Sequence, residues 1–272
     1  MNTVNDTGFT GSIPEIYERY VVPMIFEPYA RDLASRAASF NPSRVLEIAA
    51  GTGVVTRALA DVLPGHVEIV ATDLNQSMLD CAATLLMRKR LSWQQADAMQ
   101  LPFEDASFDL VVCQFGAMFF PDRAHAYAQA RRVLDTGGVL LFNVWDRIED
   151  NVFTDVVSAT LSKIYPTDPP RFMQRVPHGY WDTTVIARDL ANGGFGAPAP
   201  HIETVAMQGR APSAAMAAMA LCHGTPLRGE IEARHGATLD EATALCAIAL
   251  RERFGDSAIE GKIQAHVVTA QR

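Results

Sequence analysis

Short apolar segments alternate with helical patterns along residues 45–145 of this chain, and this alternation limits the fold more than any other feature. Five segments read as strands, at 45–49, 67–72, 92–97, 108–113 and 139–145. The fourth is almost continuously apolar, as is typical of a strand buried on both faces. Strands joined through helices need right-handed crossovers, so the pattern predicts a parallel sheet with helices on both sides.

The helices between these strands have recognisable ends. We expect them at about 53–62, 76–88 and 122–134. Asn75 is the expected N-cap of the second helix, and the glycine pair 137–138 is expected to close the third.

The segments on either side of this core are less regular. Residues 12–39 read as a helix that is broken near Pro23 and Pro28. Residues 148–180 carry four prolines and many aromatic residues, and they read as irregular.

The last third of the chain returns to regular patterns. It reads as a helix at 182–193, a strand at 201–207, a helical stretch at 212–254 and a final strand at 262–270. Thr238 and Glu241 have the spacing of a capping box, which predicts the start of a helix within the helical stretch.

The charge balance argues against a polyanionic partner. The formal net charge is −8 at pH 7, and the longest basic run, residues 88–90, reads as a solvated helix end. After the fourth strand the chain reads Gln-Phe-Gly-Ala, not the N/D-P-P-[YF] tetrapeptide that would hold a flipped base. We therefore expect no nucleic-acid partner.

Nothing in the sequence suggests secretion, a membrane span or a metal. Residues 1–6 lack the basic and apolar regions of a signal peptide, and no apolar run approaches the ~20 residues of a membrane helix. The four cysteines are scattered without C-x-x-C spacing, which predicts free thiols and no metal site. We expect a soluble cytoplasmic protein, either a monomer or a homodimer.

A loop of small residues follows the first strand, and a carboxylate ends the second. The loop, residues 49–53, lets a ligand lie against the backbone, and Asp73 can accept hydrogen bonds from a ribose. A dinucleotide-binding loop needs a third glycine, which is missing here. Glu47, just upstream, suits a ligand with a cationic amine and a sulfonium better than a pyrophosphate.

A second acidic motif completes the series. Asp97-Ala98 follows the third strand, and Ser107-Phe108-Asp109 opens the fourth. Together the three motifs resemble those of class I S-adenosylmethionine-dependent methyltransferases, in the branch similar to ubiquinone/menaquinone-biosynthesis methyltransferases. The resemblance covers about residues 43–145, and 182–207 with the final strand match the end of that fold.

This resemblance implies a Rossmann-like α/β fold: a seven-stranded, mostly parallel sheet with helices on both faces, an antiparallel last strand and helical cap insertions. The whole chain, 1–272, is then a single methyltransferase domain. Its parts are an N-terminal helical lid at 1–41, a cofactor-binding core at 42–147, cap insertions at 148–180 and 211–257, and the end of the sheet at 181–210 and 258–272.

The resemblance also assigns residues to S-adenosyl-L-methionine. Those that match the first motif, whose backbone faces the methionine part, are Glu47, Ala49, Gly51 and Gly53. The family commonly has glycine where Ala49 stands. The other implied cofactor residues are Asp73 for the ribose, Leu74, Met78, Asp97 and Ala98 for the adenine, and Gln114 for the methionine end. Asp73 could instead cap the following helix, and Asp97 could form an Asx turn.

The acceptor side is less constrained. Tyr17 and Tyr20 could close over the cofactor or pack on the sheet. The residues that suggest a small hydrophobic or aromatic acceptor are Phe115, Met118, Phe172, Tyr180 and Trp181. His178 is the first candidate for a general base, and the others are His125, Tyr180, Asp182 and His223.

The activity expected from this resemblance is methyl transfer to O, N or C of a small metabolite by in-line displacement. Two alternatives stay open at this point. One is a nicotinamide-dependent oxidoreductase, and the other is a non-catalytic module that binds the cofactor.

Overall fold

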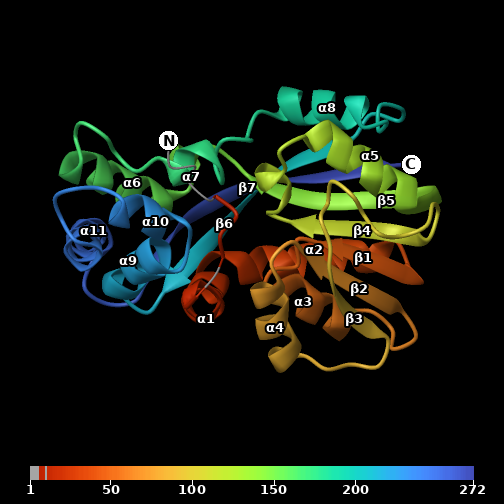
Figure 1. The fold of residues 1–272 in the computed structure, drawn as a ribbon, viewed down its shortest axis with the longest axis horizontal. Coiled ribbons are helices and arrows are strands. Elements are labelled where there is room, and N and C mark those ends of the chain that lie inside the picture. Colours follow the sequence, from red (N-terminus) through yellow and green to blue (C-terminus); the bar gives the residue numbers. More distant parts are fainter. Residues whose placement is uncertain (1–5, 10) are drawn as a thin grey trace. The chain divides into compact units, whose positions relative to one another are not determined.

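The computed structural model describes residues 6–9 and 11–272. Seven strands in this part of the chain form one sheet, in the order β3-β2-β1-β4-β5-β7-β6 (Figure 1). The strands are β1 (Arg44–Ile48), β2 (Glu68–Asp73), β3 (Leu91–Gln95), β4 (Phe108–Gln114), β5 (Leu134–Trp145), β6 (His201–Ala211) and β7 (Ile259–Gln271). The predicted seven-stranded α/β fold is confirmed.

The first five strands run parallel, and the order of the sheet reverses between β1 and β4. β2 and β3 lie on one side of β1, whereas β4 and β5 lie on the other, and all four of these pairings are parallel. β7 pairs with β5 in the antiparallel direction, as predicted. Because ligands of such sheets bind outside the carboxyl ends of the strands at the reversal, the ends of β1 and β4 are the expected site.

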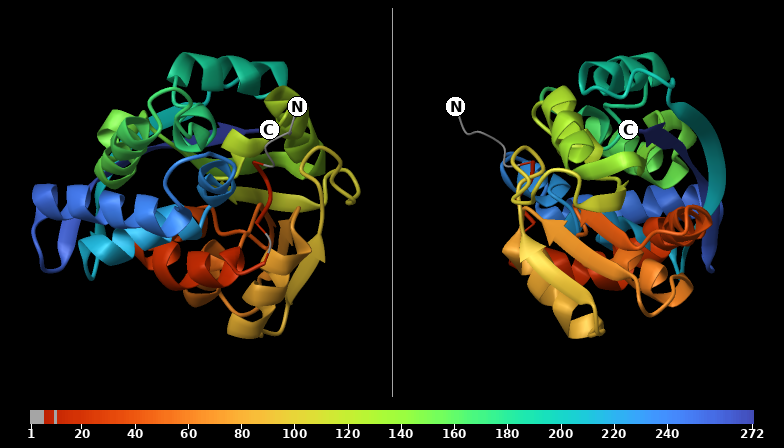
Figure 2. Two further views of the ribbon diagram at one scale, coloured as in Figure 1. Left: turned by 60° about the vertical axis from the view of Figure 1, so that its left-hand side comes forward. Right: turned by 90° about the vertical axis from the view of Figure 1, so that its right-hand side faces the viewer.

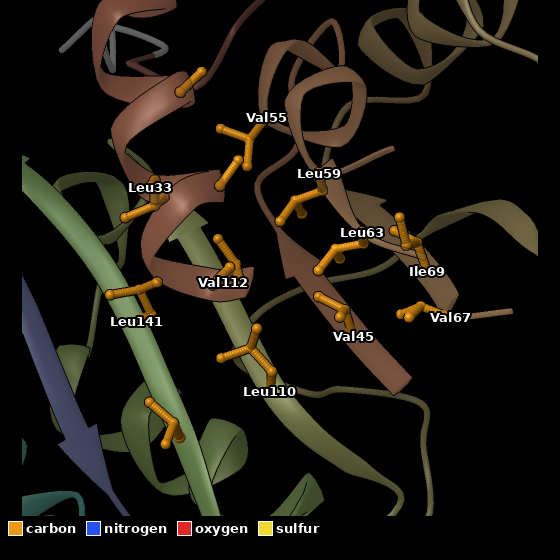
Figure 3. Close-up of a cluster of buried hydrophobic side chains, with 14 of the residues drawn as sticks. Leu33, Val45, Val55, Leu59, Leu63, Val67, Ile69, Leu110, Val112 and Leu141 are labelled. Atoms are coloured by element: carbon orange, nitrogen blue, oxygen red, sulfur yellow. The ribbon is translucent and has the colours of Figure 1, made fainter. Parts of the chain in front are cut away.

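Helices pack on both faces of the sheet. On one face, α2 (Glu27–Ser39) and α3 (Val54–Val62) supply Leu33, Val55 and Leu59 to a cluster that includes Val139 and Leu141 of β5 (Figure 3). Side chains alternate along a strand, so Phe142 points to the opposite face. There its ring lies 5.4 Å from that of Tyr127 in α5 (Arg123–Val133).

A short 3₁₀-helix, η2 (Ala117–Phe119), follows β4, and two further α-helices follow the sequence pattern. α4 spans Gln76–Leu85 and contacts β2 and β3. α8 spans Thr183–Asn192 and packs on α5.

The chain divides into two compact units. One, here the core unit, comprises Tyr29–Trp145, Tyr180–Val205 and Ala265–Arg272. The other, here the second unit, comprises Met1–Pro28, Asp146–Gly179 and Ala206–Gln264, and it holds most of the predicted lid and cap insertions. The assignment of the whole chain to a single domain stays a prediction.

The second unit is mainly helical. Besides parts of β6 and β7, it contains the helices α1 (Ile13–Ile16), η1 (Tyr17–Phe26), η3 (Ile148–Asp150), α6 (Val152–Ile164), α7 (Phe172–Arg175), α9 (Ala214–His223), α10 (Leu227–Glu232) and α11 (Leu239–Phe254). α9 and α11 lie side by side (Figure 2). The predicted capping box is confirmed, because the Thr238 side chain accepts from the Glu241 N–H and the Glu241 carboxylate accepts from the Thr238 N–H.

The predicted breaks at Pro23 and Pro28 are wrong. Residues 13–39 stay helical because η1 is a π-helix, in which the N–H of Glu27 bonds to the carbonyl of Val22, five residues back. The wider turn accommodates Pro23, which lacks an N–H and would clash within an α-helix. Pro28 lies where η1 passes into α2, and the helical path continues through it.

Two other predictions need correction. Residues 148–180 are not irregular throughout, because α6 occupies 152–164 and buries Phe153, Val157 and Leu161 at helical spacing, and the four prolines all follow it. β5 begins at Leu134 and not at 139, so the glycine pair lies within the strand. Gly137 has a φ of 80°, and the β4–β5 register shifts nearby, as in a β-bulge.

No helix in the part of the chain that the structure describes is long and apolar enough to cross a membrane.

Candidate cofactor site

β1 ends in a loop whose backbone favours small residues. Ala49, Gly51 and Gly53 have φ angles of 56°, 56° and 81°. In this left-handed region a Cβ atom crowds the next carbonyl, so glycine is preferred. Ala49 adopts it at a cost in strain.

The loop also lies close to its neighbours. A Cβ atom on Gly53 would lie 2.7 Å from Cη2 of Trp93 in β3 and 3.2 Å from Cβ of Ala82 in α4. A Cβ atom on Gly51 would lie 3.5 Å from Cε of Met78. Met78, a predicted adenine contact, is thus placed beside the loop.

Asp73 ties the end of β2 to this loop. One carboxylate oxygen accepts from the Gly51 N–H and the other from the Asn75 N–H, both at 2.8 Å. Asn75 is at the N-cap position of α4 as predicted, but its side chain makes no capping bond. Burial raises the pKa of Asp73, and the backbone hydrogen bonds oppose this shift.

Glu47 is a second carboxyl group, buried in β1 just before the loop. It is 1% exposed, and Thr56 Oγ1 of α3 donates to its Oε2 at 2.5 Å. Burial raises the pKa of Glu47 to about 8 despite this hydrogen bond. The hydroxyl of Thr72 donates to the Glu47 carbonyl at 2.8 Å, which joins β1 to β2 at the same level.

The end of β4 forms the other half of the site. Phe115 has a φ of 51°, which is rare for a large aromatic residue. Gly116 follows it, and a Cβ atom there would collide with that of Ala49 and lie 2.8 Å from Cys113 Sγ. The loops after β1 and β4 therefore touch at the point where the sheet order reverses.

The adenine-side residues follow β2 and β3. Leu74 is 47% exposed, and Ala98 is buried. Asp97 is exposed, and its Oδ1 accepts from the Met99 N–H at 2.8 Å, so it does form an Asx turn. Its contact with an adenine amino group stays a prediction.

Comparison with known proteins decides the family of this core. Residues 46–142 match the sequence profile of the family described as methyltransferase domain. This segment of the core is a methyltransferase domain. It resembles the demethylmenaquinone methyltransferase of Deinococcus radiodurans, with 41% identity over 42% of this chain and 47% of that protein.

Two further proteins extend the comparison. The ubiquinone/menaquinone biosynthesis C-methyltransferase UbiE of Pseudomonas aeruginosa is 34% identical over 58% of each chain. The chain thus spans about half the length of the curated relatives it matches. A solved structure from Anaeromyxobacter dehalogenans, of a proposed type II methyltransferase, covers 92% of this chain and 97% of its own at a TM-score of 0.59 and 18% identity, which shows the fold alone.

Methyltransferase domains of this class imply S-adenosyl-L-methionine as the cofactor, and three features fit it. The small-residue loop leaves its backbone approachable. The Asp73 carboxylate has about four lone-pair positions, of which the two backbone N–H groups use two and the Asn75 amide approaches a third at 3.5 Å. Thr52 Oγ1 in the loop is buried with no hydrogen-bond partner among the described residues, and such atoms are the kind that a ligand satisfies.

The match also disfavours the nicotinamide alternative, because the matched family transfers methyl groups.

The predicted acceptor residues of the core unit are mostly enclosed. Phe115 stacks on Trp145 at 3.8 Å between ring centroids, and Met118 Sδ accepts from the Trp145 N–H at 3.4 Å. Tyr180 is buried, and its hydroxyl accepts from that of Tyr127 at 3.3 Å, whereas Trp181 is exposed. Their contact with an acceptor stays a prediction.

Four further predicted residues, Tyr17, Tyr20, Phe172 and His178, belong to the second unit, whereas the base candidates His125 and Asp182 lie in the core unit. His178 is buried, and its Nδ1 lies 2.8 Å from the Asp146 carbonyl. Phe172 is buried. The Tyr17 ring lies 5.2 Å from that of Phe26, and the guanidinium of Arg19 lies 5.1 Å from the ring of Tyr20. The roles of these residues toward cofactor or acceptor also stay predictions.

Sequence reasoning overlooked several residues that shape the cofactor loops, namely Thr56, Trp93 and Asn143. Thr56 and Trp93 carry no local signal, because their contacts arise only from the folded packing of α3 and β3. Asn143 could have been noticed as a polar residue within the apolar run from Val139 to Trp145, since buried polar groups need partners.

Proposed function

We propose that this protein is an S-adenosyl-L-methionine-dependent methyltransferase that acts on a small hydrophobic, aromatic acceptor. The observation that carries the proposal is the pair of touching loops at the sheet reversal, with Asp73 bonded to the loop after β1. These loops lie where sheets of this kind bind their ligands, and they carry residues that suit this cofactor.

The core unit supplies the groups that would hold the cofactor. Asp73 would accept from the ribose hydroxyls, and the loop backbone from Ala49 to Gly53 would lie along the methionine part. A cationic amine beside Glu47 would lower the pKa of this carboxyl group from about 8 and so favour its charged form, and Gln114 would contact the methionine end. Asp97 would accept from the adenine amino group, with Ala98 offering a backbone N–H.

When bound, the cofactor supplies a methyl group activated by a sulfonium. The chain then has to align the acceptor with that methyl group and exclude water, and such alignment can contribute ~7–11 kcal/mol without a nucleophilic side chain. The buried aromatic residues after β4 and at the end of β5, Phe115 and Trp145, support a dry, apolar acceptor environment.

His178 remains the first candidate for removing a proton from the acceptor, but its environment makes it a weak base. Burial lowers the pKa of His178 to about 4. Because the Asp146 carbonyl can only accept, Nδ1 carries the proton, and Nε2 is the nitrogen that would take a proton from the acceptor.

The names of the relatives suggest where to look for the acceptor. One is named for demethylmenaquinone and the other for C-methylation in ubiquinone and menaquinone biosynthesis. A demethylated naphthoquinol, methylated at a ring carbon, is therefore the first acceptor to test, followed by phenols and amines.

The test is transfer of labelled methyl from S-adenosyl-L-methionine. We expect labelled product with the quinol or another small aromatic compound, and a loss of at least tenfold in Asp73→Ala, because a carboxylate that holds the ribose is removed. If the protein binds the cofactor but labels nothing in this set or in a cell extract, the proposal is wrong and a binding module is indicated.

A further inference from the structure

Asn143 is a buried polar residue that no cofactor or acceptor assignment above includes. It lies in β5, where it is the register partner of Gln114 in β4, and it is 0% exposed. The residues around it in β5 are apolar from Val139 to Trp145. An amide in such a strand is costly unless it makes hydrogen bonds.

The Asn143 amide bonds to the turn that follows β4. The Phe115 N–H donates to both Asn143 Oδ1, at 3.0 Å, and the Asn143 carbonyl, at 3.1 Å. Asn143 Nδ2 donates to Gln114 Oε1 at 3.5 Å, a long hydrogen bond. The same side chain thus contacts Gln114, the last residue of β4, and Phe115, the first residue of the turn.

This turn is strained and depends on such support. Phe115 adopts a left-handed φ of 51°, and Gly116 must stay without a side chain because of Ala49. Strained conformations of this kind persist only where the surrounding structure holds them. Phe115 is held by its stacking on Trp145 and by the two hydrogen bonds to Asn143.

We propose that Asn143 is a positioning residue that orients Gln114 and the turn after β4 for cofactor binding. The inference rests on the proposed function, because Gln114 is the group that would contact the methionine end. Asn143 acts through Gln114 and touches no cofactor itself.

The test compares S-adenosylhomocysteine binding by calorimetry in the full chain. Asn143→Leu has a similar volume but a side chain with neither donor nor acceptor. We expect it to weaken binding about tenfold, since Gln114 Oε1 loses the Asn143 amide as a donor and the Phe115 N–H keeps only the backbone carbonyl. In a Gln114→Ala background the same change should alter the dissociation constant less than twofold, because the group through which Asn143 acts is gone.

A matched control separates positioning from folding. Asn151 is also a buried asparagine, and it bonds to Arg147 and Gln264 within the second unit. Asn151→Ala should lower Tm without changing the dissociation constant more than twofold. If Asn143→Leu does not fold, Asn143→Ser takes its place in the test. Serine keeps a polar group but is too short to contact Gln114, so the same changes in dissociation constant are expected.

The outcomes are distinct. Wild-type protein that is folded but does not bind S-adenosylhomocysteine overturns the proposed function itself. Wild-type binding with Asn143→Leu within twofold overturns the role of Asn143, as does a tenfold loss that persists in the Gln114→Ala background.

Discussion

At the scale of single residues, Gly53 and Gly229 offer a direct contrast. Gly53 has a φ of 81° and lies against Trp93, whereas Gly229 lies within α10, where a Cβ atom would meet nothing within 4 Å. One glycine is required by the fold and the other is not.

We predict that Gly53→Ala lowers the free energy of unfolding by about 2–3 kcal/mol, because a left-handed alanine is strained by about 1–2 kcal/mol and its Cβ would also overlap Trp93. Gly229→Ala should instead raise it by up to about 1 kcal/mol, because alanine favours a helix. Urea denaturation measures both. Equal effects would show that the packing against Trp93 is wrongly described.

We predict that the buried carboxyl group of Glu47 lowers the free energy of unfolding as pH rises. Its folded-state pKa, raised by burial to about 8, exceeds the ordinary value of 4.5. The folded protein therefore holds a proton that the unfolded chain releases, and stability is lost as pH rises from 4.5 to 8.

Glu47→Gln cannot lose this proton, so its Tm relative to wild type should rise by several degrees between about pH 5 and pH 8. The same variant should bind S-adenosylhomocysteine more weakly, because glutamine cannot become the carboxylate that pairs with the cationic amine. Residues that serve binding often lower stability in this way. Thermal melts at the two pH values and calorimetry provide the measurements. A Tm difference that is the same at both pH values would contradict the burial of this carboxyl group.

At the scale of elements, the segment Asp146–Gly179 is closed by a hydrogen bond between its two ends. His178 Nδ1 bonds to the Asp146 carbonyl, and burial lowers the pKa of His178 to about 4 from 6.5. Below pH 6.5 the unfolded chain takes up a proton that the folded protein does not, so the stability contributed by the neutral ring is complete above 6.5 and falls as pH drops to 4.

We therefore predict that wild-type protein loses more stability than His178→Asn between about pH 7.5 and pH 4.5, by roughly 1–3 kcal/mol in urea denaturation. His66→Asn is the control, because His66 is exposed. It should follow the wild-type pH dependence. If His178→Asn does so too, the ring is not buried in its neutral form.

The elements also show how far a sequence predicts structure. The apolar run at residues 108–113 and the capping box at Thr238–Glu241 are determined by residues that are close in the sequence. Both predictions are confirmed. The π-helical path through Pro23 and the bulge at Gly137 depend on tertiary packing. The cofactor loop was predictable because it needs small residues, whereas the contacts of Trp93 and Asn143 exist only after the strands pair.

At the scale of the whole molecule, the comparisons with known proteins assign a family to part of the core unit and say less about the second unit. The matched family covers residues 46–142, within the core unit. The second unit, with η1, α6 and α9 to α11, lies outside that match. A fold supports many activities, so the acceptor has to be found by experiment.

We expect the loops at the sheet reversal to bind S-adenosyl-L-methionine through Asp73. Calorimetric titration of wild-type and Asp73→Ala protein with S-adenosylhomocysteine tests it most directly, with Gly229→Ala as a control that should bind as wild type does. We predict saturable one-to-one binding by wild type and a dissociation constant at least about tenfold higher for Asp73→Ala. No saturable binding by well-folded wild-type protein, or equal binding by Asp73→Ala, would contradict the claim.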